Sequence, residues 1–445
     1  MAAVGYPAGR RFEGAGRIAV APARLRWDPL RIAGGALILA YVWRFQDLFP
    51  VLNTIKFSTV ASVLALGLFL ANGGALKRVP GVFRNPVFRW SLVMLGLMVL
   101  SVPTSLYPGL SFSFILNDHI KTFLMLLVLA AMIRGPADVE RFAVVNIFGA
   151  AVYSYMILTH FQIGSNGRVE NLDYYDANDI GMLLVASIPL LVYFLRKGVP
   201  LRQRIPALVT GPLVMMAVVR TGSRGAFLGL IAVAAYLLFR FTAIPRRARF
   251  GSLVVLAMVF MLAASDQYWT MMSTLLHPTE DYNWSGNAQS GRMEIWKRGI
   301  GYMLRRPLTG VGVQAFPVAE GTISPLAERQ QLGFGLKWSA AHNSFVQIAA
   351  ELGVPGILAF LAFLITAFRM LGRGGPGGAR AGPTALDQGL RGSILGYAVT
   401  GFFLSQAYAA FLYALMGVVI GYLAGQPPVA PAAKRVRRRG SFRGT

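Results

Sequence analysis

The chain has 445 residues, of which 55% are hydrophobic and only 14% are charged. A soluble domain carries about a quarter charged residues, so this composition excludes an ordinary soluble protein. The net charge of +25 would suit binding to nucleic acid or to an anionic membrane surface, and the lack of cysteine excludes disulfides and thiolate metal sites.

Apolar runs of about 17–25 residues, each able to cross a bilayer as a helix, recur along the chain. The alternation expected of barrel strands is absent, so we expect an all-α membrane protein. About twelve spans are predicted, near residues 32–52, 57–72, 88–104, 114–133, 142–161, 179–195, 206–219, 225–241, 250–265, 344–368, 389–404 and 406–424.

The predicted spans divide the chain into five parts. A basic arm (1–31) precedes nine spans (32–265), a large loop (266–343), three further spans (344–424) and a basic tail (425–445). The first span shows no convincing cleavage site, so we expect it to stay in the protein rather than act as a signal peptide.

Most of the 43 Lys and Arg residues fall in alternate connecting segments when the N-terminus is placed in the cytoplasm. This bias predicts that both termini are cytoplasmic and that the large loop is external. It also explains the net charge, so the tail "AAKRVRRRGSFRGT" is interpreted as a topogenic or lipid-facing segment and no nucleic-acid partner is expected.

Within the large loop, residues 291–305 have the periodicity of an amphipathic helix that would lie on the membrane surface or cap a cavity. The predicted apolar face holds Ile295, Ile300 and Leu304 near Trp296, opposite Lys297, Arg298 and Arg305.

The segment 164–181, "GSNGRVENLDYYDANDIG", is the other external stretch of note, and it should enter a helix with Asn178 or Asp179 as its cap. Asp173, Asp176 and Asp179 could ligate a metal, but three carboxylates in one polar segment more often form a solvated turn. No metal site and no cofactor are expected.

Arginines on the external side run against the positive-inside rule and need another reason. Arg220 and Arg224 bracket the tight connection "RTGSRGAF", where a helix begins. Free N–H groups at a helix start and the planar guanidinium fork both favour a phosphate. The alternative is an interfacial arginine that reaches lipid headgroups. Arg292, at the start of the amphipathic helix, has the same two interpretations.

His342 lies in "AHNSFVQIAAELGVPG", where the tenth span begins on the same external side. A neighbouring helix start and nearby arginines disfavour imidazolium, which leaves a neutral ring that can accept a proton as a general base. The alternative is a polar residue at the first turn of a helix, with Asn343 or Ser344 as its cap. His119, in "NDHIK" at a span edge, is interpreted as structural.

Three motifs occur in order: "TGSRGAFLGL", "GRMEIWKRGIGYMLRRPLTGVGVQAF" and "AHNSFVQIAAELGVPGILAFL". Together they resemble the O-antigen ligase / O-antigen polymerase superfamily of bacterial inner-membrane glycosyltransferases, closest to the lipopolysaccharide O-antigen ligase. The resemblance covers about residues 205–368. It implies a helical glycosyltransferase fold of the C type.

The resemblance also implies a reaction. A glycan would pass from undecaprenyl pyrophosphate to a hydroxyl, such as one on lipid A–core, at the periplasmic face and without a metal. The family's paired arginines fall on Arg224 and Arg292, and its histidine falls on His342. Arg220 and Arg168 would add to the donor site, and Asn343 would orient the imidazole. One displacement predicts inversion at the anomeric carbon.

Other functions stay open from the sequence. An O-antigen or exopolysaccharide polymerase and a protein O-oligosaccharyltransferase share these motifs and differ mainly in the acceptor. A transporter or flippase of lipid-linked glycan is the alternative of another class. Transporters usually show repeat symmetry and charges at mid-membrane, whereas the polar residues here gather on the external side.

Overall fold

The computed structural model describes residues 27–165, 167–170, 172–277, 281, 283–284, 289–328, 338–372 and 382–425. The regular elements within these ranges are helices, apart from one isolated bridge between Ile163 and Val169. The all-α fold class is confirmed for this part of the chain. Most of the predicted arm (1–31) and nearly all of the predicted tail (425–445) lie outside it.

The first part of the chain forms α1 (Pro29–Leu37), the π-helix η1 (Ile38–Val42), α2 (Phe45–Leu48), α3 (Pro50–Thr54), α4 (Phe57–Ala71), α5 (Gly73–Leu76), α6 (Val79–Arg84) and α7 (Pro86–Ser101). The middle forms α8 (Pro108–Phe114), the π-helix η2 (Ile115–His119), α9 (Ile120–Met132), α10 (Pro136–Thr159), α11 (Ala177–Phe194), α12 (Leu201–Thr221), α13 (Arg224–Arg240) and α14 (Arg246–Ala263). The last part forms α15 (Asp266–Ser273), α16 (Arg292–Arg305), α17 (Phe316–Thr322), α19 (Ser344–Gly372), α20 (Ala385–Gly401) and α21 (Ala410–Ala424).

Helix starts follow local sequence rules. Proline occupies the first position of α1, α7, α8 and α10, where its missing N–H costs no hydrogen bond. The predicted cap of α11 is wrong by two or three residues: Asp176 is the cap, and Asp179 completes a capping box as the third helical residue. The Asp176 and Asp179 carboxylates thus satisfy backbone donors.

Each of the twelve predicted spans overlaps at least one helix, but fewer helices qualify as membrane spans by length and composition. Five do so among the described residues: Pro108–Met132, Pro136–Thr159, Ala177–Phe194, Leu201–Thr221 and Ser344–Gly372. Two bent pairs, broken by 80° after Ala71 and by 107° after Ala263, raise the number to seven. The chain is therefore a multi-pass helical membrane protein, and the number twelve stays a prediction.

The predicted first span, 32–52, is wrong as a single helix. The helix of α1 and η1 ends near Trp43, and Arg44 adopts a left-handed backbone conformation with a φ of +46°. A single residue in the left-handed conformation ends a right-handed helix, so the chain continues into α2 in a new direction. Arg44, Gln46 and Asp47 interrupt the apolar run at this point, and apolar residues resume at Leu48 and Phe49, which made the two stretches read as one span.

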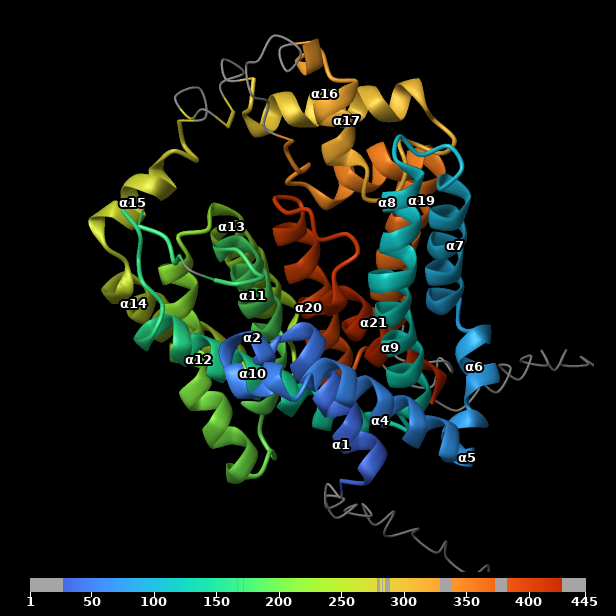
Figure 1. The fold of residues 1–445 in the computed structure, drawn as a ribbon. Helices are drawn as coiled ribbons and strands as arrows, with labels where there is room; N and C mark the ends of the chain where they lie inside the picture. The colour runs from blue at the N-terminus through green and yellow to red at the C-terminus, as the bar shows by residue number, and fades with distance from the viewer. Residues whose placement is uncertain are drawn as a thin grey trace, which may run out of the picture.

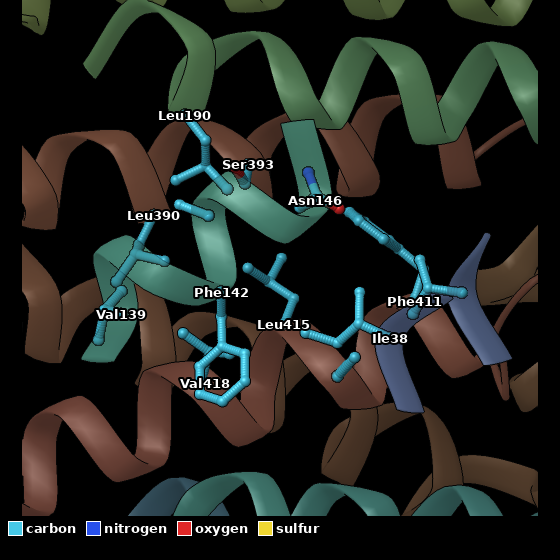
Figure 2. A pocket seen from close by; sticks show the side chains of 13 residues that line it. Ile38, Val139, Phe142, Asn146, Leu190, Leu390, Ser393, Phe411, Leu415 and Val418 are labelled. Carbon is cyan, nitrogen blue, oxygen red and sulfur yellow. The ribbon is translucent and has the colours of Figure 1, made fainter. Parts of the chain in front are cut away.

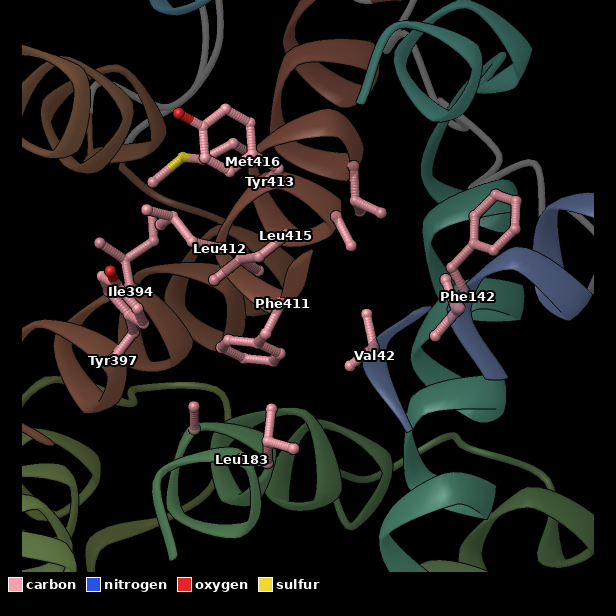
Figure 3. Close-up of a cluster of buried hydrophobic side chains, with 14 of the residues drawn as sticks. Val42, Phe142, Leu183, Ile394, Tyr397, Phe411, Leu412, Tyr413, Leu415 and Met416 are labelled. Carbon is pink, nitrogen blue, oxygen red and sulfur yellow. The ribbon is translucent and has the colours of Figure 1, made fainter. Parts of the chain in front are cut away.

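Helices α11, α13 and α20 pack together, α21 packs on α9, and α19 packs on α7. Figure 3 shows part of this core, where Phe411 of α21 lies between Tyr397 of α20 on one side and Val42 of η1 and Phe142 of α10 on the other. A cavity of about 40 Å³ remains there, lined mostly by apolar side chains (Figure 2). Ligand pockets usually enclose about 300–1,000 Å³, so this void is too small for a substrate.

The loop helices α16 and α17 lie across one end of the bundle, and α1 begins at the opposite end (Figure 1). Asp28, at the start of α1, pairs with Arg134 at 3.2 Å. A Cβ added to Gly425, after α21, would lie 3.3 Å from the Arg134 carbonyl oxygen. The first and last described residues are therefore at the same end, away from α16.

Candidate active site

Arg224 is the first residue of α13 and directly follows the sharp turn that ends α12. Gly222 in this turn has a φ of +57°, a conformation that favours glycine. Ser223 caps α13 by accepting a hydrogen bond from the N–H of Ala226 at 3.2 Å. The guanidinium group therefore lies beside a helix start, whose dipole and free N–H groups favour anions.

The large loop holds the guanidinium group of Arg224. This group donates to Thr274 Oγ1 at 2.8 Å and forms an ion pair with Asp281. The Asp281 carboxylate also accepts from the backbone N–H and the side-chain amide of Asn283, at 2.8 and 2.9 Å.

Burial raises the pKa of Asp281, but the hydrogen bonds from Arg224 and Asn283 outweigh burial and hold this pKa below its usual value of 3.8. Asp281 is therefore a carboxylate at neutral pH. It occupies part of the fork that a phosphate would use.

The same loop leads to the start of α16. The carbonyl of Asn283 accepts a hydrogen bond from the N–H of Met293 at 2.9 Å. Arg292, half-buried, is the preceding residue and the first of α16. One turn later, the indole of Trp296 donates to the carbonyl of Ala341 at 3.0 Å. Helix α16 thus connects the segment that holds Arg224 with the residue before His342.

His342 is half-buried and adopts a left-handed backbone conformation, with a φ of +48°, just before α19. Its N–H donates to Ser405 Oγ at 2.8 Å. Positive φ is uncommon outside glycine, and such residues gather at ligand-binding sites. The structure therefore fixes the backbone of this histidine from the turn between α20 and α21.

Asn343 is the N-cap of α19. Its Oδ1 accepts hydrogen bonds from the N–H groups of Phe345 and Val346 at 2.9 and 3.1 Å, and its side chain is buried. This is the capping role that the sequence offered as the alternative for Asn343. That Asn343 also orients the imidazole stays a prediction.

The turn between α20 and α21 touches both sides of the site. Ser405 accepts the N–H of His342, and Ser344 exchanges hydrogen bonds with the backbone of Leu404 and Gln406 at 2.7 and 3.0 Å. A Cβ added to Gly225, the residue after Arg224, would lie 2.9 Å from Phe403 Cβ. Phe403 and Ser405 therefore bring the start of α13 and the start of α19 together.

Arg168 and Arg220 lie at the same α12–α13 turn. Arg168 Nε donates to the Thr221 carbonyl at a long 3.5 Å, and the N–H of Val169 donates to the Arg220 carbonyl at 3.2 Å. The side chain of Arg220 is exposed. The structure thus brings Arg168, Arg220 and Arg224 to one turn. Helix α16 links this turn to the rest of the site, because Arg292 is its first residue and Trp296 binds the carbonyl of the residue before His342.

The predicted range of α16 is confirmed, but its predicted faces are wrong. Ile295 is buried as expected, whereas Ile300 and Leu304 are exposed. The buried side is completed by Gly299 and Tyr302. A Cβ on Gly299 would lie 2.5 Å from Val346 of α19, so the absence of a side chain lets the two helices approach.

Arg298 also departs from its predicted place opposite the apolar face, because its side chain is largely buried. Its guanidinium donates to both carboxylate oxygens of Glu320 on α17, at 2.5–3.1 Å, and Tyr302 donates to the same carboxylate at 2.7 Å. Burial lowers the pKa of Arg298. The hydrogen bonds and the negative charge of Glu320 outweigh this effect, so the pKa lies above its usual value. This arginine holds α16 to α17.

Sequence reasoning did not find Asp281, Thr274 or the turn at Phe403 and Ser405. One signal was present: only 18 acidic residues accompany the 43 basic ones, so an acidic residue in an arginine-rich loop is a candidate counter-ion. The turn carried no such signal, because serine and phenylalanine at the end of an apolar helix are ordinary.

Residues 207–361 match the family model described as O-antigen ligase. The chain carries an O-antigen ligase domain. The superfamily expected from the three sequence motifs is thereby confirmed, and with it glycosyl transfer of the ligase or polymerase type, with a lipid-linked glycan and an acceptor as partners in general. No curated protein matches the chain.

The O-antigen ligase domain includes most of the predicted site residues. Arg220, Arg224, Arg292, His342 and Asn343 lie within the matched segment, whereas Arg168 precedes it. Their individual roles stay predictions.

Proposed function

We propose that this O-antigen ligase domain protein transfers a glycan from undecaprenyl pyrophosphate to a hydroxyl of lipid A–core at the periplasmic face of the bacterial inner membrane. The observation that carries the proposal is the single contact network around Phe403 and Ser405. Phe403 lies against Gly225, the residue after Arg224, and Ser405 binds the backbone N–H of His342, while Trp296 near the start of α16 binds the carbonyl of Ala341, the residue before His342.

The position of Arg224 supports a lipid-linked donor. A cavity of about 270 Å³ begins one helical turn beyond Arg224, at Phe227, and runs between α13 and α14. Its lining is almost wholly apolar and includes Leu230, Leu237, Leu253 and Leu256. A cationic group above an apolar channel fits an anionic head with a long hydrocarbon tail, which is the chemistry of a polyprenyl diphosphate.

The proposed reaction is one displacement. The acceptor oxygen forms a bond to the anomeric carbon, and the bond from that carbon to the diphosphate oxygen breaks with its electron pair on the diphosphate. Arg224 and Arg292, with Arg220 and Arg168 at the rim, would stabilise this developing charge. His342 would take the proton of the attacking hydroxyl. Attack opposite the leaving group inverts the anomeric carbon.

The test is transfer by the purified full chain in lipid nanodiscs, with undecaprenyl-pyrophosphate glycan as donor and lipid A–core as acceptor. Arg224→Ala and His342→Ala should each lower kcat by about 10²–10³-fold, the loss typical of a group that stabilises transition-state charge or moves the proton. Lys297→Ala on the exposed side of α16 is the matched control and should keep full activity.

Two results would contradict the proposal. Full turnover by Arg224→Ala or His342→Ala would remove these residues from the reaction. Turnover that joins donor glycans to one another, with no product on lipid A–core, would assign the chain to polymerisation. Disruption of the gene separates the same outcomes in cells, since a missing ligase leaves long carrier-linked chains and a missing polymerase leaves single repeat units.

A further inference from the structure

A third and larger cavity lies beside the backbone of His342. It encloses about 890 Å³, and its lining includes Ala341, the residue before His342, and Ser405, which binds the His342 N–H. Of the described residues, Arg224, Arg292 and His342 do not line it, and the cavity reaches His342 only through its neighbours Ala341 and Ser405. The cavity is therefore built by elements other than α13 and α16, which begin with the two arginines.

The wall of this cavity contains both π-helices of the described chain. Ala40 and Tyr41 of η1 line it, as do Asp118 and His119 of η2. A π-turn within an α-helix is a strained feature that is common at functional sites. Two π-helices, from segments about 75 residues apart, line this one cavity. We therefore take the cavity to be a functional feature rather than a packing defect.

Charged side chains line the cavity within a candidate membrane span. Asp118 and Lys121 both lie in the apolar helix Pro108–Met132, and both face the cavity. A charge in lipid is costly, so such residues are expected to face a polar ligand or a water-filled space. This segment is the one place in that span where polar residues gather.

Three buried side chains of the wall carry polar atoms without a hydrogen-bond partner. They are Gln46 Oε1, both ring nitrogens of His119 and Gln347 Oε1. Each side chain belongs to a residue less than a tenth exposed, and the three come from α2, η2 and α19. Unpaired buried polar groups are disfavoured, so a ligand that supplies donors and acceptors would be bound well.

Aromatic rings complete the wall. Tyr41, Phe114, Tyr174 and Tyr408 all line the cavity, and the guanidinium of Arg44 lies 3.6 Å from the ring centre of Tyr174. A saccharide presents hydroxyl groups around its rim and C–H groups on its faces. Amides, an imidazole and charged groups interspersed with aromatic rings provide contacts for both.

We infer that this cavity binds the saccharide of the acceptor and sets which acceptor is used. The inference rests on the proposed function for the direction of transfer, since the bound saccharide would present its hydroxyl to His342. Most of the wall lies outside residues 207–361, so the parts that select the acceptor are largely separate from the matched family segment.

The kinetic test varies the lipid A–core concentration at saturating donor, with the full chain in nanodiscs. Gln347→Leu and Asp118→Asn should raise the KM for acceptor by about tenfold, the effect of losing one good hydrogen bond to a polar ligand. The KM for donor and kcat should change less than about twofold. Asn117→Ala is the matched control, because Asn117 adjoins Asp118 in η2 and does not line the cavity.

A binding test without donor separates this inference from the proposed reaction. The probes are the delipidated core oligosaccharide and a free O-antigen repeat-unit oligosaccharide. Protection of residues 114–122 from hydrogen exchange by either probe, weakened in Asp118→Asn, supports the cavity as an acceptor site even if no transfer occurs. Preference for the core probe indicates a ligase, and preference for the repeat unit indicates a polymerase.

Two outcomes overturn the inference. In the first, the wild-type chain transfers glycan while Gln347→Leu and Asp118→Asn leave the KM for acceptor unchanged. In the second, both variants change the KM for donor as much as the KM for acceptor, which is the result of a general structural effect. Asp118 is exposed on its helix, so Asp118→Asn should fold even if Gln347→Leu does not.

Discussion

Asp281 forms an ion pair with Arg224, and this contact closes the large loop onto the first residue of α13. The arginine proposed to bind a diphosphate is therefore already bound to a carboxylate from its own chain. Thr274 and Asn283 hold the two partners in place. A donor diphosphate would have to displace this carboxylate or share the guanidinium with it.

Replacing Asp281 by asparagine should lower the KM for the donor. The variant keeps the shape of the side chain but removes the charge that competes with the diphosphate. A partly exposed ion pair contributes up to about 1 kcal/mol, which corresponds to roughly a fivefold change. Initial rates at varied donor concentration measure it. Asp266→Asn, an exposed acidic residue of the same loop, should leave the KM unchanged. A higher KM in Asp281→Asn would instead mean that Asp281 positions Arg224.

The loop should stay attached down to low pH. Because the folded-state pKa of Asp281 is below 3.8, its stabilising contribution is complete above that value and is lost as the pH falls through the folded pKa. Hydrogen exchange of residues 268–277 should therefore show constant protection from pH 8 to pH 5, after correction for intrinsic rates. Protection in wild type that already falls between pH 6 and pH 5 would contradict this assignment.

The ion pair between Arg298 and Glu320 should matter far more than its exposed neighbour on α16. Both side chains are largely buried, so Glu320→Ala leaves an uncompensated guanidinium and should destabilise the loop by about 3–5 kcal/mol. Lys297 pairs with Glu294 at the surface, and Lys297→Ala should cost less than about 1 kcal/mol. Limited proteolysis and thermal unfolding in detergent compare the two. Equal stability of both variants would show that Glu320 does not hold α17 to α16.

Two glycines near α19 should respond in opposite ways to alanine. Gly353 has a φ of +68°, and an added Cβ would lie 2.4 Å from the Pro307 carbonyl oxygen, so Gly353→Ala should destabilise the chain by more than about 1 kcal/mol. Gly301, inside α16, has open space around it, and Gly301→Ala should stabilise by about 0.5–1 kcal/mol. Thermal unfolding of each variant tests the pair, and a neutral Gly353→Ala would refute the close contact.

The lack of cysteine allows a direct test of sidedness. Lys297→Cys on α16 should react with a membrane-impermeant maleimide in intact spheroplasts, because the large loop is proposed to be periplasmic. Lys197→Cys, exposed between α11 and α12, should react only after lysis. Labelling with the opposite pattern would invert the proposed topology, and the proposed active site would then face the cytoplasm.

Helix positions were predictable because long apolar runs and proline starts are local signals. The break at Arg44 and the bends after Ala71 and Ala263 were not, because they depend on backbone conformation and on contacts with distant helices. The apolar pattern of 57–72 and 250–265 is the same whether a helix crosses the membrane alone or bends. The number of crossings therefore could not be read from composition.

The site residues themselves could be proposed from the sequence, since Arg224 and His342 lie within short recognisable motifs. Their partners could not. Asp281 lies 57 positions beyond Arg224, and Ser405 lies 63 beyond His342, so only the fold brings them together. The faces of α16 were misjudged for a related reason: Glu320 makes the burial of Arg298 favourable, and no periodicity within α16 indicates a counter-ion on α17.

Phe403 contacts the residue after Arg224, and Ser405 holds the backbone of His342. Only Leu404 separates them, and two steps along an extended chain reach at most about 7 Å. The distance between Arg224, proposed to bind the leaving diphosphate, and His342, proposed to accept the proton, is therefore set by the tripeptide 403–405, which takes no part in the reaction itself. Lengthening this connection by one residue would shift the two ends relative to each other, so its length should be as constrained as the identity of the arginine and the histidine.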